Sequence, residues 1–296
     1  MSEVRTKLRR LMERNGLAPL IGAYDVLSAK IAERAGVELL HVGGYNLAAA
    51  HLGLPDAGYL TLMENVEIVR RIAANVNIPV IADGDDGYGN YLNIRRTIVE
   101  MEGAGLAGVH IEDQVLPKRC GHIAGKRIIA KEAMIQKIKA AVDIRKDPGF
   151  MIIARTDAIQ ANGLEDALER AQAYWEAGAD VIFVEAVLDH EQAAAVPKSI
   201  DGPCLYNWVF RGVSPQYTFK EVENLGYKLV LYTDALFPVA RLLTEYYEEL
   251  VKTGGYGRLA ERMMPFDKFN ELLGLDEVAE LDRRYGSTEG GQKTAE

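Results

Sequence analysis

The segment LEDALERAQAYWEAGADVIFVEA, residues 164–186, contains the repeating unit that decides the fold of this chain. Its first part predicts an amphipathic helix over 164–178, because apolar side chains recur at spacings of four, three and four residues, at Leu164, Leu168, Ala171 and Trp175. Gly178 can take the left-handed conformation that ends a helix. The near-continuous apolar run at 180–186 predicts a strand that is buried on both faces. The unit therefore runs helix, glycine, strand.

The same unit recurs along the chain. Gly36, Gly105 and Gly226 each follow a helical pattern and precede an apolar run. The apolar runs predict strands at 19–24, 37–44, 78–85, 108–113, 150–157, 180–186, 203–209 and 228–233. Eight strands that alternate with helices indicate an α/β fold of the (β/α)8 TIM-type barrel class. A doubly wound open sheet is the competing fold, but the first strand ends Ala23-Tyr24-Asp25, without the glycine-rich phosphate turn that such sheets often carry.

The rest of the chain fits one barrel domain with an extension. Thr61 and Glu64 predict a capping box that begins the helix after the second strand. Residues 238–284 predict further helices beyond the eighth strand, which are candidates for packing between subunits. We therefore expect a single domain at 1–285, which includes these C-terminal helices, and a disordered tail at 286–296.

The composition excludes several classes of protein. The 296 residues include 34 Lys and Arg and 43 Asp and Glu, and the net charge of −9 argues against a nucleic-acid partner. Hydrophobic residues at 48% and charged residues at 26% exclude disorder. Two cysteines are too few for a disulfide scaffold, and the charged N-terminus does not read as a signal peptide. No apolar run approaches the roughly 18 residues of a membrane span. We expect a soluble, cytoplasmic protein of a size that favours an enzyme, with no membrane partner.

Polar side chains stand at the predicted C-terminal ends of nearly all strands. In a (β/α)8 barrel these ends meet on the rim where catalytic residues lie. One polar residue at a strand end says little, but several carboxylates and an arginine on one rim indicate a functional site. The residues are Asp25, Gly43, Gly44, Tyr45, Asp83, Asp85, Asp86, Glu112, Asp113, Arg155, Asp157, Glu185, Asn207 and Tyr232.

The block IADGDDGYGN at 81–90 suggests a metal site on this rim. Asp83 and Asp85 are two residues apart and share a face, and Glu112 ends the next strand. Carboxylates this close repel unless a cation neutralises them, and three oxygen donors suit a hard divalent ion, most simply Mg²⁺. The alternative is a turn cluster, since Asp-Gly pairs also make tight turns. We favour the metal for Asp83, Asp85 and Glu112, and the turn for Asp86.

The segment QVLPKRCGHIAGK at 114–126 predicts a reactive lid. Cys120 is flanked by Lys and Arg and precedes His122, so we expect its thiol to have a lowered pKa and to transfer protons. Gly121 and Gly125 could act as pivots of a closing lid. The alternatives are a buried, inert Cys120 and a zinc site, for which too few ligands are near.

Two further features carry open alternatives. Arg155 could grip a substrate carboxylate, with Asn207 adding a donor. Alternatively, Arg155 and Glu185 could form a structural ion pair at the barrel top, and the two roles are compatible. Gly43-Gly44 could cradle a small anion with backbone N–H groups, or could form a tight turn. His41 and His110 lie in strands and are interpreted as core histidines, and Cys204 is interpreted as a core residue.

Several motifs together resemble the isocitrate lyase and phosphoenolpyruvate mutase superfamily, and most closely its methylisocitrate lyase branch. They are GAYD at 22–25, GLPD at 53–56, DGDDGYG at 83–89, HIEDQ at 110–114, KRCGH at 118–122, ARTDA at 154–158 and EA at 185–186. The resemblance runs from about residue 17 to 200, and more loosely to 280. KRCGH is the most specific of these motifs, because in the family it marks carbon–carbon lyases rather than phosphonate mutases.

The resemblance implies a metal-dependent enzyme that assembles with copies of itself. It implies a barrel whose last helix is exchanged between subunits, usually in a homotetramer. It also implies Mg²⁺, with Mn²⁺ as the alternative metal, bound mainly through Asp85, while Asp83 and Glu112 hold its waters. The implied substrates are small 2-hydroxy or 2-oxo dicarboxylic acids and their relatives, whose carboxylate binds the metal and the backbone at Gly43-Gly44.

The implied reaction is a retro-aldol cleavage of a 2-hydroxy di- or tricarboxylic acid. A 2-oxo acid leaves, and Cys120 protonates the other fragment. Arg155 contacts the oxygens around the cleaved bond, and Tyr24 and Glu185 assist proton movement. A 2-methylisocitrate-like or alkylmalate-like substrate is the first expectation, and decarboxylation or hydrolysis of oxaloacetate at the same site is the alternative. A phosphonomutase and a non-catalytic binding protein rank below both.

The chain departs from the family pattern on the distal side of the expected pocket. After the seventh strand, where the lyases usually have Asn-x-Thr-Glu-Phe-Gly, this chain has Asn207-Trp208-Val209-Phe210-Arg211-Gly212. Tyr45 follows the glycine pair in place of a small residue, and Tyr232-Thr233 replaces a Tyr-Pro pair. We expect Gly43, Gly44, Tyr45, Gly121, His122, Asn207 and Arg211 to bind substrate, with Arg211 either holding a distal carboxylate or facing solvent.

Overall fold

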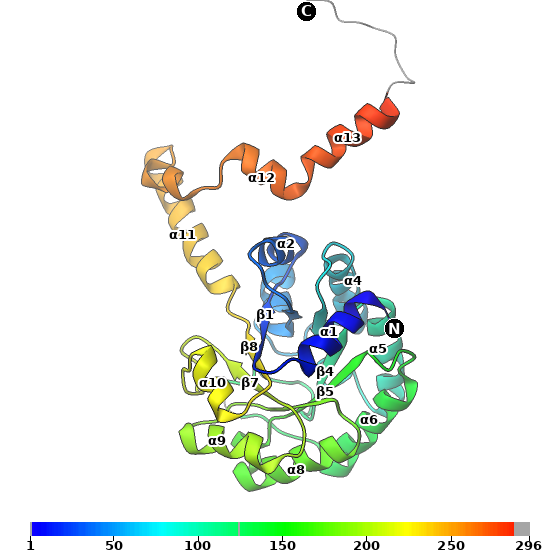
Figure 1. The fold of residues 1–296 in the computed structure, drawn as a ribbon. Helices are drawn as coiled ribbons and strands as arrows, with labels where there is room; N and C mark the ends of the chain where they lie inside the picture. The colour runs from blue at the N-terminus through cyan, green and yellow to red at the C-terminus, as the bar shows by residue number, and fades with distance from the viewer. Residues whose placement is uncertain (1, 124, 287–296) are drawn as a thin grey trace, which may run out of the picture. The chain divides into compact units, whose positions relative to one another are not determined.

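The computed structural model describes residues 2–123 and 125–286, and its central feature is a closed barrel of parallel strands (Figure 1). Each strand pairs with the next in chain order, and the eighth pairs with the first. This confirms the (β/α)8 TIM-type barrel and all the predicted strands. The strands are β1 (Ala18–Gly22), β2 (Leu40–Val42), β3 (Val80–Asp83), β4 (Gly108–Glu112), β5 (Met151–Thr156), β6 (Val181–Val184), β7 (Cys204–Trp208) and β8 (Leu229–Tyr232).

Helices follow the strands and surround the barrel (Figure 1). The N-terminal helix α1 (Glu3–Glu13) precedes β1. The helices after successive strands are α2 (Val26–Arg34), α3 (Gly44–Leu47) with the π-helix η1 (Ala48–Leu52) and α4 (Leu62–Ala73), α5 (Tyr91–Gly103), α6 (Lys131–Ile144), α7 (Ala158–Asn162) with α8 (Leu164–Glu176), α9 (His190–Ser199) and α10 (Phe219–Leu225). The predicted helix at 164–178 is therefore α8, and the capping box between Thr61 and Glu64 is present at the start of α4.

The glycine that joins helix to strand has the predicted conformation at all four joints. The backbone angle φ is +90° at Gly36, +88° at Gly105, +103° at Gly178 and +101° at Gly226. A side chain at these positions would be strained, because L-residues with a Cβ rarely adopt this region. The backbone conformation at the joint therefore explains why glycine recurs between each of these helices and the following strand.

The alternation of side chains along each strand decides which residues reach the rim. On β5, Met151 and Ile153 belong to the cluster of buried residues inside the barrel, whereas Ile152 and Ala154 belong to the cluster between strands and helices. Arg155 continues the inward set to the C-terminal end of the strand. The same two-residue step brings Glu185, Asn207 and the other rim residues over the barrel interior.

The N-terminal end of the barrel interior is filled by α1. Leu8 and Leu11 are buried in the same cluster as Ala18 and Leu229, which lie at the beginnings of β1 and β8. Arg5 is anchored beside them, and its Nε donates to the Leu106 carbonyl oxygen at 3.0 Å. The opposite, C-terminal end is therefore the end that can form a cavity.

The chain divides into two compact units, Met1–Pro238 and Val239–Glu296. The barrel is the first unit. Helix α11 (Leu236–Thr253) begins in the first unit and continues into the second, which also contains the 3-10 helix η2 (Gly257–Arg262), α12 (Phe266–Leu273) and α13 (Leu275–Tyr285). The extra C-terminal helices are thus confirmed, while the predicted tail lies, except for Gly286, outside the described residues. Over the described ranges, no helix is both long and apolar enough to cross a bilayer.

Candidate active site

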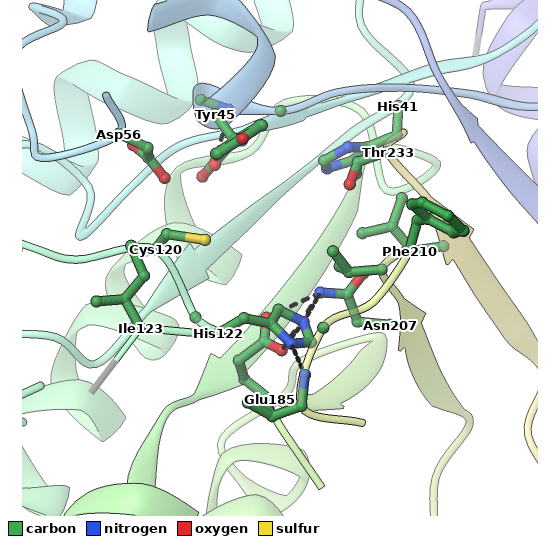
Figure 2. A pocket seen from close by; sticks show the side chains of 18 of the residues that line it. His41, Tyr45, Asp56, Cys120, His122, Ile123, Glu185, Asn207, Phe210 and Thr233 are labelled. Atoms are coloured by element: carbon green, nitrogen blue, oxygen red, sulfur yellow. Dashed lines mark hydrogen bonds and ion pairs between the residues drawn. The ribbon is translucent and has the colours of Figure 1, made fainter. Parts of the chain in front are cut away.

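A cavity of about 340 Å³ opens at the C-terminal end of the barrel (Figure 2). It lies at the small end of the range of ligand pockets, which is roughly 300–1,000 Å³. Most of the predicted site residues line it: Gly43, Gly44, Tyr45, Asp83, Cys120, Gly121, His122, Arg155, Glu185, Asn207 and Arg211. Asp85 and Glu112 are not in the lining but are buried next to it, in contact with lining residues. Tyr24 is also outside the lining, and its backbone carbonyl oxygen instead contacts the His51 ring.

The acidic cluster contains a lysine at its centre. The Lys118 Nζ lies 3.1 Å from Asp56 Oδ1 and 3.7 Å from Asp83 Oδ2, and it also contacts Asp85 Oδ1. The Lys118 side chain is only 3% exposed. Its carboxylate neighbours raise its pKa well above the ordinary value, although burial opposes this, so the amine keeps its proton. The cluster is therefore arranged around a positive charge.

Two stacked histidines support the cluster from inside the barrel. The His110 Nε2 lies 2.7 Å from Asp83 Oδ1, and the His110 Nδ1 lies 3.2 Å from the His41 Nε2. Burial, together with the charge on His110, lowers the pKa of His41 to about 3, so His41 is neutral. Burial alone would raise the pKa of Asp83, but the attraction of His110 and Lys118 lowers it well below its ordinary value. The histidines are buried strand residues, as expected, and they also hold Asp83 in place.

The cluster has the donors that a hard divalent cation needs. The Asp83, Asp85 and Glu112 side chains all carry oxygens, and the Glu112 Oε1 is buried with no hydrogen-bond partner. Burial raises the pKa of Asp85 to about 6 and that of Glu112 well above its usual range, which shows how strongly both carboxyls need a nearby cation. In residues 2–123 and 125–286, no three His, Cys, Asp or Glu side chains already form a metal cage. Asp83 and Asp85 instead contact the Lys118 ammonium, and Glu112 Oε2 lies 3.3 Å from the Arg155 Nε.

Arg155 connects the acidic cluster to the other wall of the cavity. Its guanidinium donates to both oxygens of Asp157, at 2.8 and 3.0 Å. It also lies 3.3 Å from Glu112 Oε2 and 3.2 Å from Glu185 Oε2, over the Phe183 ring. The predicted pairing of Arg155 with Glu185 is therefore confirmed. This network fixes the guanidinium at the cavity wall, and what it binds there stays a prediction.

Cys120 lies on the cavity wall with its sulfur pointing inward (Figure 2). The expectation that its pKa is lowered was wrong, because burial raises the pKa of the thiol. The flanking Lys118 does not stabilise a thiolate, since its ammonium is bound to the acidic cluster. Cys120 is therefore a protonated thiol at neutral pH, which can donate a proton but is a poor nucleophile.

His122 attaches the lid segment to the wall that carries Glu185 and Asn207 (Figure 2). The Val213 backbone N–H donates to His122 Nδ1 at 3.0 Å, so the neutral ring carries its hydrogen on Nε2. That Nε2 lies 3.4 Å from Glu185 Oε1. Asn207 Nδ2 also donates to Glu185, at 3.1 Å. Glu185 thus accepts a hydrogen bond from Asn207 and lies close to the His122 ring.

A second attachment of the lid is formed by Lys126. Its buried Nζ donates to Asp157 Oδ1 at 2.8 Å and contacts the Gly121 carbonyl oxygen. Asp157 also holds Arg155, so one carboxylate joins the lid to the catalytic wall. A Cβ at Gly121 would lie 2.6 Å from the Arg155 Nη2 and 2.5 Å from the Glu185 Cδ, so the close approach requires glycine.

The contacts of Gly44 and Asp86 bear on two of the alternatives that the sequence leaves open, the anion cradle at Gly43-Gly44 and the turn at Asp86. The Gly44 N–H donates to Asp83 Oδ2 at 3.0 Å, so it serves the acidic cluster. A Cβ at Gly44 would come within 3.1 Å of the Lys118 Nζ. Asp86 accepts from the Tyr88 N–H at 2.9 Å and forms the predicted turn. The structure shows no free Gly44 N–H for a substrate anion.

The distal wall is mainly apolar. Val209, Phe210, Val213, Phe237 and Ile123 line it, where the family pattern has a hydroxyl and a carboxylate. Arg211 has a positive φ of 57°, and its guanidinium lies over the Phe210 ring at 5.2 Å. A strained non-glycine residue of this kind is most often found at a functional site.

Sequence reasoning did not identify Asp56, Lys118 and Lys126 as site residues. Each lies in a motif that was noticed, but in a connection whose path is not fixed by strand periodicity. The usable signal for Lys118 is charge, since a cluster of buried carboxylates requires a cation nearby. For Lys126 the signal is the Gly-Lys pair at the end of the lid.

Comparison with known sequences places this arrangement in context. A family model described as phosphoenolpyruvate phosphomutase matches residues 8–251. The chain is 40% identical to the 2,3-dimethylmalate lyase of Eubacterium barkeri over 282 residues. This aligned region covers 95% of this chain and 98% of that protein. It is 37% identical to a 2-methylisocitrate lyase of Aeropyrum pernix over 276 residues, a region that covers 93% of this chain and 89% of that protein.

Solved structures are similarly close. An oxaloacetate acetylhydrolase in complex with 3,3-difluorooxalacetate has a TM-score of 0.90 at 34% identity, covering 96% of this chain and 97% of that one. A 2,3-dimethylmalate lyase, described as a PEP mutase/isocitrate lyase superfamily member, has a TM-score of 0.90 at 35% identity and 99% coverage of both. A phosphonopyruvate hydrolase complexed with oxalate and Mg²⁺ has a TM-score of 0.87 at 29% identity, covering 96% and 99%.

Proposed function

The chain belongs to the PEP mutase/isocitrate lyase superfamily, and from this premise we propose that it is a carbon–carbon lyase. We propose a small 2-hydroxy dicarboxylic acid with an alkyl substituent as its substrate. One observation carries the proposal: the protonated thiol of Cys120 lines the same cavity as Asp83, which belongs to a cluster of carboxylates built around a positive charge. That combination suits a reaction that binds an anionic substrate through a cation and delivers one proton to carbon.

We propose Mg²⁺ as the cofactor, with Mn²⁺ as the alternative. Asp85 would hold the metal, supported by Asp83 and Glu112, whose unpartnered Oε1 is the clearest free donor. The phosphonopyruvate hydrolase structure, which contains Mg²⁺, supports the choice of metal. When bound, the ion supplies Lewis-acid polarisation of the oxygens next to the cleaved bond and a fixed orientation of the substrate.

The remaining steps belong to the side chains of the cavity. The proton of the 2-hydroxyl leaves to Glu185, whose carboxylate is oriented by His122 and Asn207. The C2–C3 bond then breaks, C2 becomes the carbonyl carbon of a 2-oxo acid, and the electron pair passes to C3 and its carboxylate. Cys120 donates its thiol proton to C3, and Arg155 holds carboxylate oxygens at the wall. The lid excludes water, which would otherwise protonate the intermediate.

The distal wall favours an alkyl substituent over a third carboxylate. Val209, Phe210 and Phe237 offer apolar surface there, and each buried methylene of a substrate contributes roughly 0.8 kcal/mol. A substrate carboxylate on that wall would lose its hydrating water, and Arg211 would be its one basic partner among the described residues that line that wall. This supports a substrate of the 2,3-dimethylmalate type, ahead of one of the 2-methylisocitrate type.

Release of a 2-oxo acid from a panel of substrates tests the proposal. The panel is 2,3-dimethylmalate, other alkylmalates, 2-methylisocitrate and oxaloacetate, each with Mg²⁺ and with EDTA. We expect the alkylmalates to have the highest kcat/KM, EDTA to abolish turnover, and Asp85→Ala to do the same. Asp86→Asn is the matched control, since Asp86 forms a turn beside the cluster. If no compound turns over, the lyase proposal is wrong.

Hydrolysis or decarboxylation of oxaloacetate is the second candidate function. The similarity in fold to the oxaloacetate acetylhydrolase, at a TM-score of 0.90, supports it. Hydrolysis would give oxalate and acetate, and decarboxylation would give pyruvate and CO₂. If oxaloacetate alone turns over and Cys120→Ala keeps the activity, this candidate replaces the lyase.

A further inference from the structure

The Lys118 ammonium and a divalent cation require the same carboxylate oxygens. Lys118 contacts Asp85 Oδ1, and its Nζ lies 3.7 Å from Asp83 Oδ2 and 3.1 Å from Asp56 Oδ1. Asp83 and Asp85 are also the residues proposed to hold the metal. A Cβ at Gly44 would lie within 3.2 Å of Asp83, Asp85 and Lys118 atoms, so the Gly44 backbone packs directly against the oxygens that the ammonium occupies.

We propose that Lys118 is an internal counter-cation that competes with the divalent ion for Asp83 and Asp85. The proposal rests on the metal site of the proposed function. When the metal binds, the ammonium gives up these two carboxylates and keeps its contact with Asp56. Asp56 is not one of the residues proposed to hold the metal. When the metal is absent, the ammonium returns and neutralises the buried acidic cluster.

Burial makes this competition energetically important. The Asp83 and Asp85 side chains are 8% and 6% exposed, and buried carboxylates without a counter-charge repel each other strongly. His110 contacts Asp83 on the side away from Lys118, so it cannot replace the ammonium at Asp85. Lys118 therefore holds the cluster together in the metal-free protein.

The competition also couples the metal to the lid. Lys118 precedes Cys120 by two residues, and Gln114 fixes the intervening chain, since its Nε2 donates to the Arg119 carbonyl oxygen at 2.9 Å. A shift of the ammonium toward Asp56 moves the start of the segment that carries the thiol. The exchange of the ammonium and the metal at Asp83 and Asp85 would then change both the metal occupancy and the position of Cys120.

Calorimetric titration of Mg²⁺ into metal-free protein tests the competition. We expect Lys118→Met to bind Mg²⁺ at least about tenfold more tightly than the wild type, because the competitor is gone. Lys118→Arg keeps the charge, and we expect an affinity within a few-fold of the wild type. Lys137→Met is the matched control, since Lys137 is also buried but contacts Asp86 rather than the cluster. We expect no change from it.

Thermal unfolding gives a second measurement that is independent of turnover. In EDTA we expect Lys118→Met to melt below the wild type, and we expect Mg²⁺ to raise its Tm by more than it raises the wild-type Tm. If Lys118→Met is unfolded in EDTA, folding on addition of Mg²⁺ gives the same answer. Equal or weaker Mg²⁺ binding by Lys118→Met overturns the proposal, because the lysine would then assist the metal.

The outcomes separate this proposal from the proposed function. If neither the wild type nor Lys118→Met binds Mg²⁺, the counter-cation proposal fails, while turnover in EDTA still decides whether the chain is a lyase. If all substrates fail to turn over but the affinities change as expected, the competition stands and the lyase proposal fails.

Discussion

In the proposed reaction, Cys120 is the residue on which the chemistry depends most. Its raised pKa keeps the thiol protonated, and it lines the same cavity as Asp83 of the acidic cluster. We expect Cys120→Ala and Cys120→Ser to lower kcat by about 10²–10⁴-fold, the usual contribution of a positioned acid. Binding of oxalate, measured by calorimetry, should change little. Cys204→Ala is the control, because Cys204 is buried in β7 away from the cavity. Unchanged turnover in Cys120→Ala would remove the thiol from the mechanism.

His122 makes the lid sensitive to acid. Burial lowers its pKa, and its neutral Nδ1 accepts from the Val213 N–H. The charged groups that face it are Glu185, Arg155, Lys126, Asp157 and Asp234. Because the pKa is lower in the folded state than in the unfolded one, the attachment is fully present above the unfolded pKa of about 6.5 and is lost as pH falls below it.

The pH profile of kcat/KM checks this effect. Because kcat/KM reports the pKa of the folded enzyme, we expect an acidic limb below about pH 6.5. We expect this limb to flatten in His122→Gln, whose amide oxygen can still accept from the Val213 N–H. His190→Gln is a matched change at an exposed histidine that contacts Tyr217 outside the cavity. An acidic limb of the same position and slope in His122→Gln would exclude His122 as its source.

Individual site residues were predictable to different degrees. Arg155, Glu185 and Asn207 could be assigned to the rim because each continues the inward-facing set of its strand. The raised pKa of Cys120 could not be predicted, since it depends on burial by a connection with no periodic pattern. Asp56 and Lys118 were missed for the same reason.

The lid is the element that joins the two walls of the cavity. Lys126 attaches it to Asp157, which also binds Arg155. We expect Lys126→Met to lower kcat/KM by about tenfold to a hundredfold, since a displaced lid costs that much positioning. Cleavage by trypsin after Lys118 and Arg119 should become faster, and oxalate should protect less. Lys139→Met, on the exposed side of α6, is the control. Unaltered proteolysis in Lys126→Met would show that Lys126 does not hold the lid.

Regular elements were easier to predict than connections. The eight strands have near-continuous apolar runs because both faces are buried, and the glycine joints have a backbone requirement that sequence reveals. Helix α3 instead begins at Gly44, whose N–H donates to Asp83, and the lid is attached through His122, which lies close to Glu185. Those contacts depend on the closed barrel and are therefore invisible in a local pattern.

At the scale of the whole molecule, the unit Val239–Glu296 suggests self-assembly. Val251 on α11 and Phe266 on α12 are 87% and 84% exposed, and Leu275, Val278 and Leu281 on α13 are also exposed. Apolar faces of this extent mark interfaces between proteins. We propose that they pack between copies of this chain, in a homotetramer that exchanges its C-terminal helices, as expected from the family resemblance.

Light scattering on the purified protein checks this assembly. We expect a tetramer for the wild type and smaller species for Val251→Asp with Phe266→Asp, since buried charges at an interface are costly. Both side chains are more than four-fifths exposed in the part of the chain that the structure describes, so folding of the barrel should be unaffected. Lys252→Asp is the control on the same helix. A monomeric wild type would contradict the proposed assembly.

The central claim is that the chain cleaves the C2–C3 bond of a 2-hydroxy dicarboxylic acid, releases a 2-oxo acid and protonates the other fragment. Proton NMR of 2,3-dimethylmalate incubated with the purified enzyme and Mg²⁺ tests it most directly. We predict pyruvate and propanoate in equal amounts, formed by the wild type and not by Cys120→Ala. Unchanged 2,3-dimethylmalate, together with conversion of oxaloacetate to oxalate and acetate, would contradict the claim.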